Sequence, residues 1–282
     1  MSVNSLDLGR FKSIEFIMGA VLVGGIAFAV LFSHWLFPGG GSEVNLAMRL
    51  TPPMTEASFP FGTDPLGRDV LARVIIGGEI SLKVGFYSAL GAVVIGIIMG
   101  LLSGYYGGFV DMIVMRFADV QLALPFILLA ITFIAVIGGG LNNMIILLII
   151  SQWVQYARLV RGSVMSLKDR EFILSAKAIG VRDWRILFQH LLPNLLGPVV
   201  VLMTLNVANN ILLESSLTFL GLGIDPVIPS WGGMLAEGRN YLQTAWWVSV
   251  FPGLAILLTV LGLNLLGDWL RDALDPTGRT SR

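Results

Sequence analysis

Few residues in this 282-residue chain have side chains that could do chemistry, and they gather in two places. The first is a polar group inside an apolar stretch, formed by Asn206, Asn209 and Asn210, with Glu214 one turn later. Such side chains in an apolar helix either bond to neighbouring helices or line a water-filled path that contacts a solute. Both interpretations stay open for the three asparagines, and Glu214 could also meet a partner or only its own loop. The second place is the charged stretch 158–193.

The sequence contains no set of residues typical of catalysis or of metal binding. Cysteine is absent, and the only two histidines, His34 and His190, are far apart with no second ligand nearby. The patterns G-x-S-x-G and H-E-x-x-H are missing, and so is a pair of intramembrane aspartates. No G-x-x-x-x-G-K-[ST] phosphate loop is present either. We therefore expect no catalytic residue, no metal site and no cofactor bound by this chain.

The composition shows what kind of element must position these side chains. Hydrophobic residues make up 55% of the chain and charged residues only 13%, roughly half the usual share for a soluble domain. This excludes a water-soluble globule, and it excludes a disordered chain, which needs low hydrophobicity. Eighteen basic and eighteen acidic residues cancel, so no net charge attracts nucleic acid. The class that remains is an all-α, polytopic membrane protein.

Six apolar windows are long enough to cross a bilayer as helices, which takes about 20 residues. The fourth window is interrupted by Gln152 and Gln155, and the third contains Pro125. The first window is too long for a cleaved signal peptide and ends in a poor cleavage site. The six windows are Ile17–Leu36, Val84–Tyr105, Val120–Ile137, Met144–Val160, Leu195–Leu213 and Ala245–Leu266.

The distribution of Lys and Arg predicts the orientation. With both termini in the cytoplasm, thirteen of the eighteen basic residues fall in cytoplasmic segments and five in outer ones. The prediction is a cytoplasmic segment 1–15 and a membrane domain 16–282. That domain has outer loops 38–83 and 214–244, a cytoplasmic loop 161–194 and a cytoplasmic tail 268–282. Within the first outer loop, residues 70–81 are expected to form a short helix in the interface plane.

The cytoplasmic loop predicts two short helices. Asp169 can cap the first, and Gly180 can end it in the left-handed conformation. Asp183 can cap a second helix, Trp184–Leu192, which Pro193 would end. Apolar residues of the first helix repeat at helical spacing and predict one stripe, made of Phe172, Ile173, Ala176 and Ile179. The stripe is expected either to rest on lipid or on the fold, or to dock in a groove of a soluble partner.

Two further patterns concern packing. Small residues recur every four positions along the second window, at Gly96, Gly100 and Gly104 among others, and such stripes let helices approach closely in lipid. They predict packing within this subunit, or alternatively contact with a second subunit or a sliding pathway wall. Arg116 and Asp119 are three residues apart and are expected to form an ion pair.

The cytoplasmic loop resembles the "EAA" loop of ABC-importer permeases. Residues 174–180 read LSAKAIG and, after nine more residues, 190–193 read HLLP. Ala176, Gly180, Leu192 and Pro193 match the pattern, whereas Leu174, Ser175 and His190 replace its Glu, one of its Ala residues and its Ile. Other stretches extend the resemblance to nearly the whole chain from residue 60 onward, in particular FGTDPLGRDVLAR at 61–73, LALP at 122–125, FLGLG at 219–223 and GDWLRDALDP at 267–276. The likeness is greatest to the branch that imports dipeptides, oligopeptides or nickel.

The resemblance implies a machine with several subunits in the bacterial cytoplasmic (inner) membrane. It implies a second homologous permease, two cytoplasmic ATP-binding subunits that hold ATP and Mg²⁺, and an extracytoplasmic substrate-binding protein. It also implies that the first loop helix couples to the ATPase. The coupling residues would be Asp169, Arg170, Glu171, Phe172, Ile173, Ser175, Ala176, Ile179 and Gly180.

The cargo stays open at this point. Small peptides are the first expectation, nickel the second and another small solute the third. A different class, a secondary transporter driven by an ion gradient, usually shows an inverted repeat and charged midplane residues. Neither feature is evident in this sequence, so the ATP-driven importer is the preferred interpretation.

Overall fold

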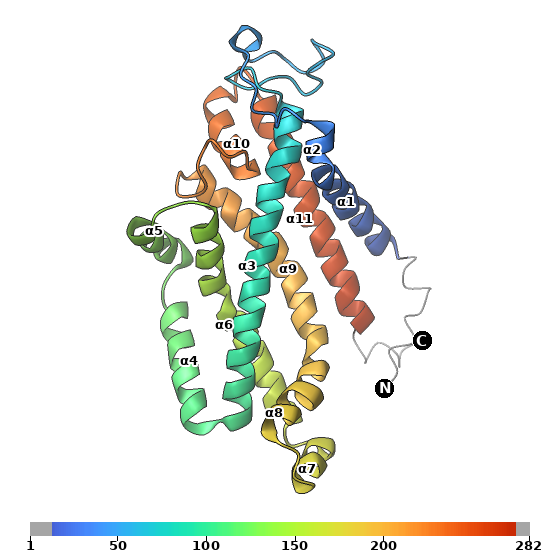
Figure 1. Cartoon of the computed structure of the whole chain (residues 1–282), viewed down its shortest axis with the longest axis vertical. Coiled ribbons are helices and arrows are strands. Elements are labelled where there is room, and N and C mark those ends of the chain that lie inside the picture. Colours follow the sequence, from blue (N-terminus) through green and yellow to red (C-terminus); the bar gives the residue numbers. More distant parts are fainter. Residues whose placement is uncertain (1–12, 275–282) are drawn as a thin grey trace.

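The computed structural model describes residues 13–274, and the ends of the predicted terminal segments, 1–12 and 275–282, lie outside the described residues. The described part is helical, with one isolated β-bridge between Thr63 and Asp69. Figure 1 shows the long helices running side by side along one axis. The long elements are α1 (Ile14–Leu31), α3 (Val70–Tyr106), α4 (Gly108–Leu122), α5 (Phe126–Ile137), α6 (Leu141–Leu167), α9 (Leu192–Phe219) and α11 (Trp247–Leu274). The short ones are α2 (Ser33–Leu36), η2 (Leu46–Met48), α7 (Glu171–Ala178), α8 (Asp183–Arg185), the π-helical turn η3 (Ile186–Leu191), α10 (Trp231–Gly238) and η4 (Arg239–Tyr241).

Five of the described helices are long and apolar enough to cross a membrane, and a sixth crossing exists only if a bent pair counts as one. The third predicted span, Val120–Ile137, is this bent pair rather than one continuous helix. The chain breaks between α4 and α5, whose axes differ by 93°. Pro125, the residue just before α5, has an extended ψ of 133°. Proline has no N–H to donate to the preceding turn, so the helix stops here and starts again in a new direction.

The second span is longer than predicted. α3 begins at Val70, capped by the Asp69 carboxylate, which accepts from the Leu71 N–H at 2.9 Å. Residues 70–81, expected as a separate interfacial helix, are the first turns of α3. Its 37 residues extend about 55 Å at 1.5 Å per residue, well beyond the ~30 Å hydrocarbon core. The outer part of α3 therefore supports the loops around it.

The loops gather at the two ends of the bundle as the predicted topology requires. Figure 1 shows the segment between α2 and α3, together with α10, at one end, and the turn between α3 and α4, together with α7, at the other. The two predicted outer loops thus lie together, opposite the predicted cytoplasmic loop. This arrangement is the one expected when successive membrane crossings run in opposite directions.

The central packing contact is between α3 and α6, where the small-residue stripe of α3 lies. A Cβ added to Gly100 would lie 2.6 Å from the Ala157 carbonyl oxygen, and one added to Gly104 would lie 2.8 Å from the Val164 Cβ. Gly96 likewise faces the α6 backbone at Trp153. Of the two interpretations of this stripe, the structure supports close packing within the subunit.

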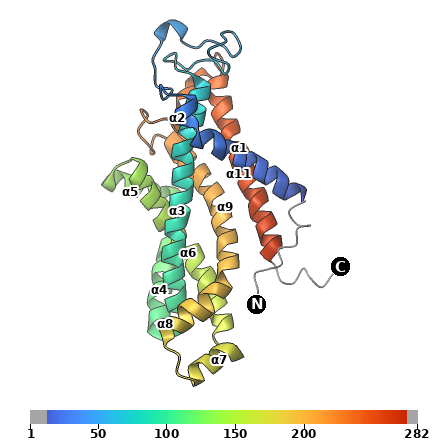
Figure 2. The ribbon, with the colours of Figure 1, turned by 45° about the vertical axis from the view of Figure 1, so that its right-hand side comes forward.

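At the periphery, α1 packs along α11. A Cβ on Gly19 would lie 2.9 Å from the Leu266 Cγ, and the Phe16 and Trp269 rings are 4.6 Å apart. On the opposite flank, Figures 1 and 2 both show α5 projecting from the bundle. Its residues Ile127, Leu128 and Val136 are exposed. A wide apolar surface is thus left uncovered on the α4–α5 flank.

Candidate functional site

The predicted coupling helix, α7, is attached to the bundle by one of its faces. Ile173 is 0% exposed and belongs to the core cluster shared with α3, α6, η3 and α9, and Ala176 is buried beside it. Phe172 and Ile179 are 44% and 81% exposed. At 100° per residue, positions 173 and 176 share one face, while 172, 175 and 179 share another. The prediction of a single apolar stripe is therefore corrected: Ile173 and Ala176 are buried against the bundle, while the Phe172–Ser175–Ile179 face is free for a partner.

The two ends of α7 differ in how well they were predicted. Arg170 occupies the N-cap position without a side-chain cap, and Asp169 is exposed one residue earlier, so the predicted cap is wrong. Gly180 has a φ of +77°. Its N–H donates to the Lys177 carbonyl and the next N–H, of Val181, donates to the Ala176 carbonyl, both at 3.0 Å. This is the Schellman arrangement, and it confirms Gly180 as the residue that ends the helix.

The second helix of the loop does not stop at Pro193 as predicted. After α8 the chain widens into the π-turn η3 and runs on into α9 without a break. The Leu192 N–H donates to the Leu187 carbonyl, five residues back. Pro193 lies in the first turn of α9, where a missing N–H costs little. The predicted cap, Asp183, instead uses its carboxylate to bind another helix.

Polar contacts connect this loop to the membrane helices. The Tyr105 hydroxyl, at the end of α3, donates to Asp183 Oδ1 at 2.7 Å, and Lys177 Nζ lies 4.9 Å from the Tyr105 ring centroid. Arg161 of α6 donates two hydrogen bonds, at 2.5 and 2.6 Å, to the Asp111 carboxylate of α4, which also accepts from the Ser103 hydroxyl of α3. A fork-to-fork pair of this kind is directional as well as strong. The ends of α3, α4, α6 and α8 are therefore held as one unit.

A neighbouring expectation about ion pairing is corrected by this set of contacts. Asp119 forms its ion pair with Arg158 of α6, at 2.6 Å, rather than with Arg116. Both partners of the observed pair are exposed, so it contributes little to stability. The pair is significant because it joins α4 to α6.

The four polar residues of α9 separate into two groups. Asn210 is 0% exposed and donates to Ser88 Oγ at 2.7 Å, and Glu214 is 0% exposed and accepts from Thr218 at 3.0 Å and Ser81 at 3.2 Å. Both side chains are enclosed between α3 and α9. Of the alternatives left open for these two residues, the structure supports hydrogen bonds between helices within the subunit.

Asn206 and Asn209 differ from this buried pair. Asn206 is buried but donates at 3.3 Å to Gln155 Oε1 on α6. Asn209 is exposed and lines a pocket of about 360 Å³ at the bend between α4 and α5. The pocket is lined by Gln121, Leu122, Leu124, Phe126, Leu129, Ser151, Gln152, Gln155, Asn209 and Leu213. Asn209 thus remains the pathway candidate of the four.

Gln152 is the member of this pocket that sequence reasoning did not single out. Its side chain is 3% exposed, and neither its amide nitrogen nor its amide oxygen has a hydrogen-bond partner among the described residues. The signal was present in the sequence as a glutamine within an apolar window. That signal does not distinguish a pocket-lining amide from one that bonds between helices.

The end of the bundle that carries the 61–73 loop and α10 is held by a buried ion-pair network. Asp64, 0% exposed, accepts from Arg68 Nε at 2.6 Å and also pairs with Arg73, while both arginines reach Glu237 of α10, at 2.6 and 2.8 Å. Asp64 and the two arginines lie in the 61–73 stretch that carries the family resemblance. The network fixes this loop onto α3 and α10.

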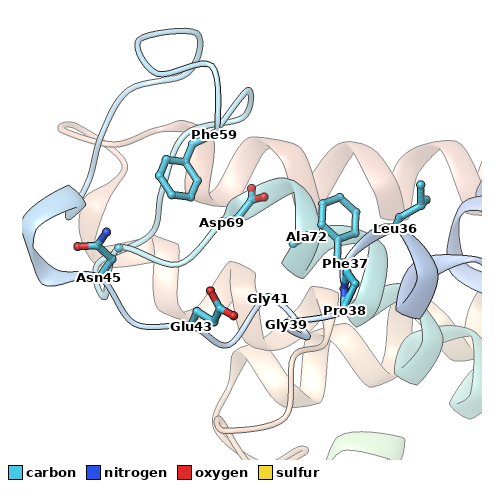
Figure 3. A pocket seen from close by; sticks show the side chains of 11 residues that line it. Leu36, Phe37, Pro38, Gly39, Gly41, Glu43, Asn45, Phe59, Asp69 and Ala72 are labelled. Atoms are coloured by element: carbon cyan, nitrogen blue, oxygen red, sulfur yellow. The ribbon is translucent and has the colours of Figure 1, made fainter.

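Beside this network, the loop after α2 encloses a pocket of about 300 Å³ (Figure 3). Figure 3 shows Phe37, Phe59, Glu43 and Asp69 around it. Burial raises the pKa of the Asp69 carboxyl, which already serves as the cap of α3. The pocket lies at the same end of the bundle as the ion-pair network.

Comparisons with known proteins agree on one family. The family described as "Binding-protein-dependent transport system inner membrane component" matches residues 92–279. The dipeptide transport system permease protein DppC of Alkalihalophilus pseudofirmus is 43% identical over 260 residues, which cover 92% of this chain and 85% of that protein. The glutathione transport system permease protein GsiD of Escherichia coli is 49% identical over 216 residues, 77% of this chain and 71% of that protein.

A solved structure shows the same fold. A chain of the MetNI methionine ABC transporter, in an inward facing conformation, superposes with a TM-score of 0.57. The match covers 73% of this chain and 97% of that one, at 20% sequence identity. At this identity the likeness concerns the fold.

Proposed function

The chain belongs to the family of binding-protein-dependent transport system inner membrane components, and we propose that the cargo it helps to import is a small peptide. It is a multi-pass inner-membrane permease of the ABC-importer type, a transport component rather than an enzyme. The observation that carries the cargo proposal is the identity of 43–49% to permeases named for dipeptides, di- and tripeptides, and glutathione, itself a tripeptide. The cargos in those names share a peptide bond.

The proposal includes the composition of the machine. This chain forms half of the pathway with a second homologous permease, two ATP-binding subunits carry out the hydrolysis of ATP with Mg²⁺, and an extracytoplasmic binding protein delivers the cargo. The projection of α5 from the bundle supports the proposal of a second permease, because Ile127, Leu128 and Val136 are exposed there without a covering helix of this chain among the described residues. The family's description supports the binding protein.

The proposed coupling runs through the free face of α7. Phe172 and Ile179 insert into a groove on an ATPase subunit, with Ser175 between them and Arg170 and Glu171 at the entrance. Ile173 and Ala176, buried beneath, keep α7 seated on η3 so that it moves with the bundle. When ATP closes the ATPase pair, α7 is displaced. The contacts at Asp183 and Asp111 carry the movement to α3, α4 and α6. Permease halves then rotate between inward and outward access.

The test is transport by the reconstituted complex. The chain is purified with the permease, ATPase and binding-protein subunits encoded beside it and placed in liposomes, with radiolabelled alanyl-alanine bound to the binding protein outside. We expect uptake that needs ATP inside and survives a protonophore. Uptake that stops with the protonophore but continues without ATP would refute the ATP-driven mechanism, and uptake of Ni²⁺ but of no peptide would refute the cargo.

A further inference from the structure

The pocket at the α4–α5 bend has an uncommon combination of a neutral polar floor and apolar walls. Its ten lining residues include no Asp, Glu, Lys or Arg. Three side-chain amides besides Gln121 face it, those of Gln152, Gln155 and Asn209, while Leu122, Leu124, Phe126, Leu129 and Leu213 form the walls. A charged solute would find no counter-ion among these residues. The pocket therefore offers hydrogen bonds to an uncharged polar group such as a peptide bond, and no counter-ion to the charged termini of a peptide.

Most polar groups around the pocket already have partners. Gln121 donates to the Ile150 carbonyl at 2.6 Å and accepts from Trp153 Nε1 at 2.7 Å. Gln155 accepts from Asn206, and the Ser151 hydroxyl donates to the Leu148 carbonyl at 2.8 Å. These contacts position the floor of the pocket.

Gln152 differs from Tyr156, Asn210 and Ser249, which each have one buried polar atom without a partner among the described residues, because both polar atoms of its side chain lack one. Both ends of its amide are buried, and neither has a partner among the described residues. A buried amide left unpaired in an apolar setting destabilises the fold, which is why native buried polar groups nearly always have partners. Packing between α6 and its neighbours gives no reason for this residue, since Leu or Met would fill the same space without the penalty. Because Gln152 lines the pocket, a polar group that enters the pocket would supply the missing partners of the amide.

We propose that Gln152 forms a hydrogen-bonded pair with a peptide bond of the cargo as it passes, with Asn209 as the second contact, an inference that rests on the proposed peptide-import function. A primary amide has a donor and an acceptor on one planar group, and so does a secondary peptide bond, so the two pair in either chain direction. The apolar walls accept side chains of different size. Because the hydrogen bonds to the peptide bond do not involve the side chains of the cargo, one pocket serves many peptide sequences.

A neighbouring pocket provides the contrast. It shares Gln121 and Leu124 with the first one, but its other lining residues are Met99, Ile113, Val114, Phe117, Val120 and Trp153. The Gln121–Trp153 hydrogen bond lies between the two. Free amides face only the first pocket, and the second is nearly all apolar, as a surface facing lipid or another helix would be. The unpaired amides are thus confined to the pocket that contains Gln152.

The experiment compares two cargos that differ in one atom group, in the reconstituted full complex with saturating loaded binding protein. Alanyl-alanine has a peptide N–H, and alanyl-lactate replaces it by an ester oxygen. The measured quantity is the ratio of their maximal uptake rates, in the wild type and in Gln152→Leu. Discrimination by the binding protein contributes equally to both complexes, so it cancels when the two ratios are compared.

We expect Gln152→Leu to lower alanyl-alanine uptake about threefold to tenfold, the size of one neutral hydrogen bond, and alanyl-lactate uptake less, so that the ratio moves toward one. Thr204→Val is the matched control on α9. It removes a hydroxyl that bonds only to the Val200 carbonyl of its own helix, and it should leave both rates unchanged. An assembled Gln152→Leu complex with the wild-type ratio would overturn the proposal.

If the complex with Gln152→Leu does not assemble, the ratio of uptake rates is measured in the Asn209→Leu complex instead. Asn209 is exposed on the pocket, so its replacement leaves the packed interior intact. A ratio shifted toward one supports the proposal, and an unchanged ratio overturns it. A wild-type complex that imports neither cargo but does import another solute refutes the peptide function itself, which is a different outcome.

Discussion

The Tyr105 hydroxyl donates to the Asp183 carboxylate across 2.7 Å and joins the inner end of the longest helix, α3, to the first turn after α7. The two residues are 78 positions apart in sequence. Because the Tyr105 ring also lies under Lys177, this one side chain contacts the segments before and after the reversal at Gly180. It is placed to pass a displacement of α7 into α3.

Replacing Tyr105 by Phe should weaken coupling. The variant keeps the ring and loses the hydroxyl, and because the contact is near the surface we expect a loss of about 1 kcal/mol or less. Peptide uptake per ATP hydrolysed, measured in liposomes, should fall about twofold to fivefold while folding is kept. Tyr106→Phe, an exposed neighbour, is the control, and equal behaviour of the two variants would argue against the link.

Gly180→Val should uncouple hydrolysis from uptake. A Cβ at Gly180 meets nothing within 4 Å, so the effect would come from backbone conformation alone. The φ of +77° costs a non-glycine residue about 1–2 kcal/mol, and more for a β-branched one. Gly162→Ala, also in open space but inside α6, should be tolerated. Normal uptake per ATP in Gly180→Val would contradict the coupling assignment.

The two faces of α7 should respond differently to truncation. Phe172→Ala and Ile179→Ala remove exposed side chains, so the isolated chain should keep its thermal stability while its affinity for the ATPase subunits, measured by co-purification, falls. Ile173→Ala empties a buried position and should destabilise the chain by about 2–5 kcal/mol. If loss of Phe172 lowers the melting temperature as much as loss of Ile173, the assignment of the free face is wrong.

Arg73→Met should strongly destabilise the end of the bundle that carries the 61–73 loop and α10. It removes one partner of the fully buried Asp64 carboxylate, a change that costs about 3 kcal/mol or more when the remaining charge stays buried. Lys83→Met breaks the exposed pair with Glu79 on the same helix and should cost about 0–1 kcal/mol. Thermal unfolding in detergent compares the two variants. Similar melting temperatures would show that the Asp64 network contributes no more to stability than the exposed ion pair.

Much of this protein could be predicted from local chemistry. Apolar length defined five of the six crossings, because burial of a helix in lipid depends on composition alone. The reversal at Gly180 could be predicted because only glycine takes a positive φ at low cost. The loop motif at 174–193 indicated the family, and the comparisons confirmed it.

The remaining features depended on neighbours that are distant in sequence. Helical periodicity groups Ile173 with Ala176 but cannot say that this face, rather than that of Phe172, meets η3. It places Asn210 on one side of α9, yet only the approach of α3 makes that side the buried one and leaves Asn209 at the pocket. Pro125 was visible within the third window, but the 93° angle between α4 and α5 is seen only in the tertiary structure. The sequence determined the helices and their faces; the tertiary structure decided which face each neighbour covers, because burial is a property of pairs of elements and not of one.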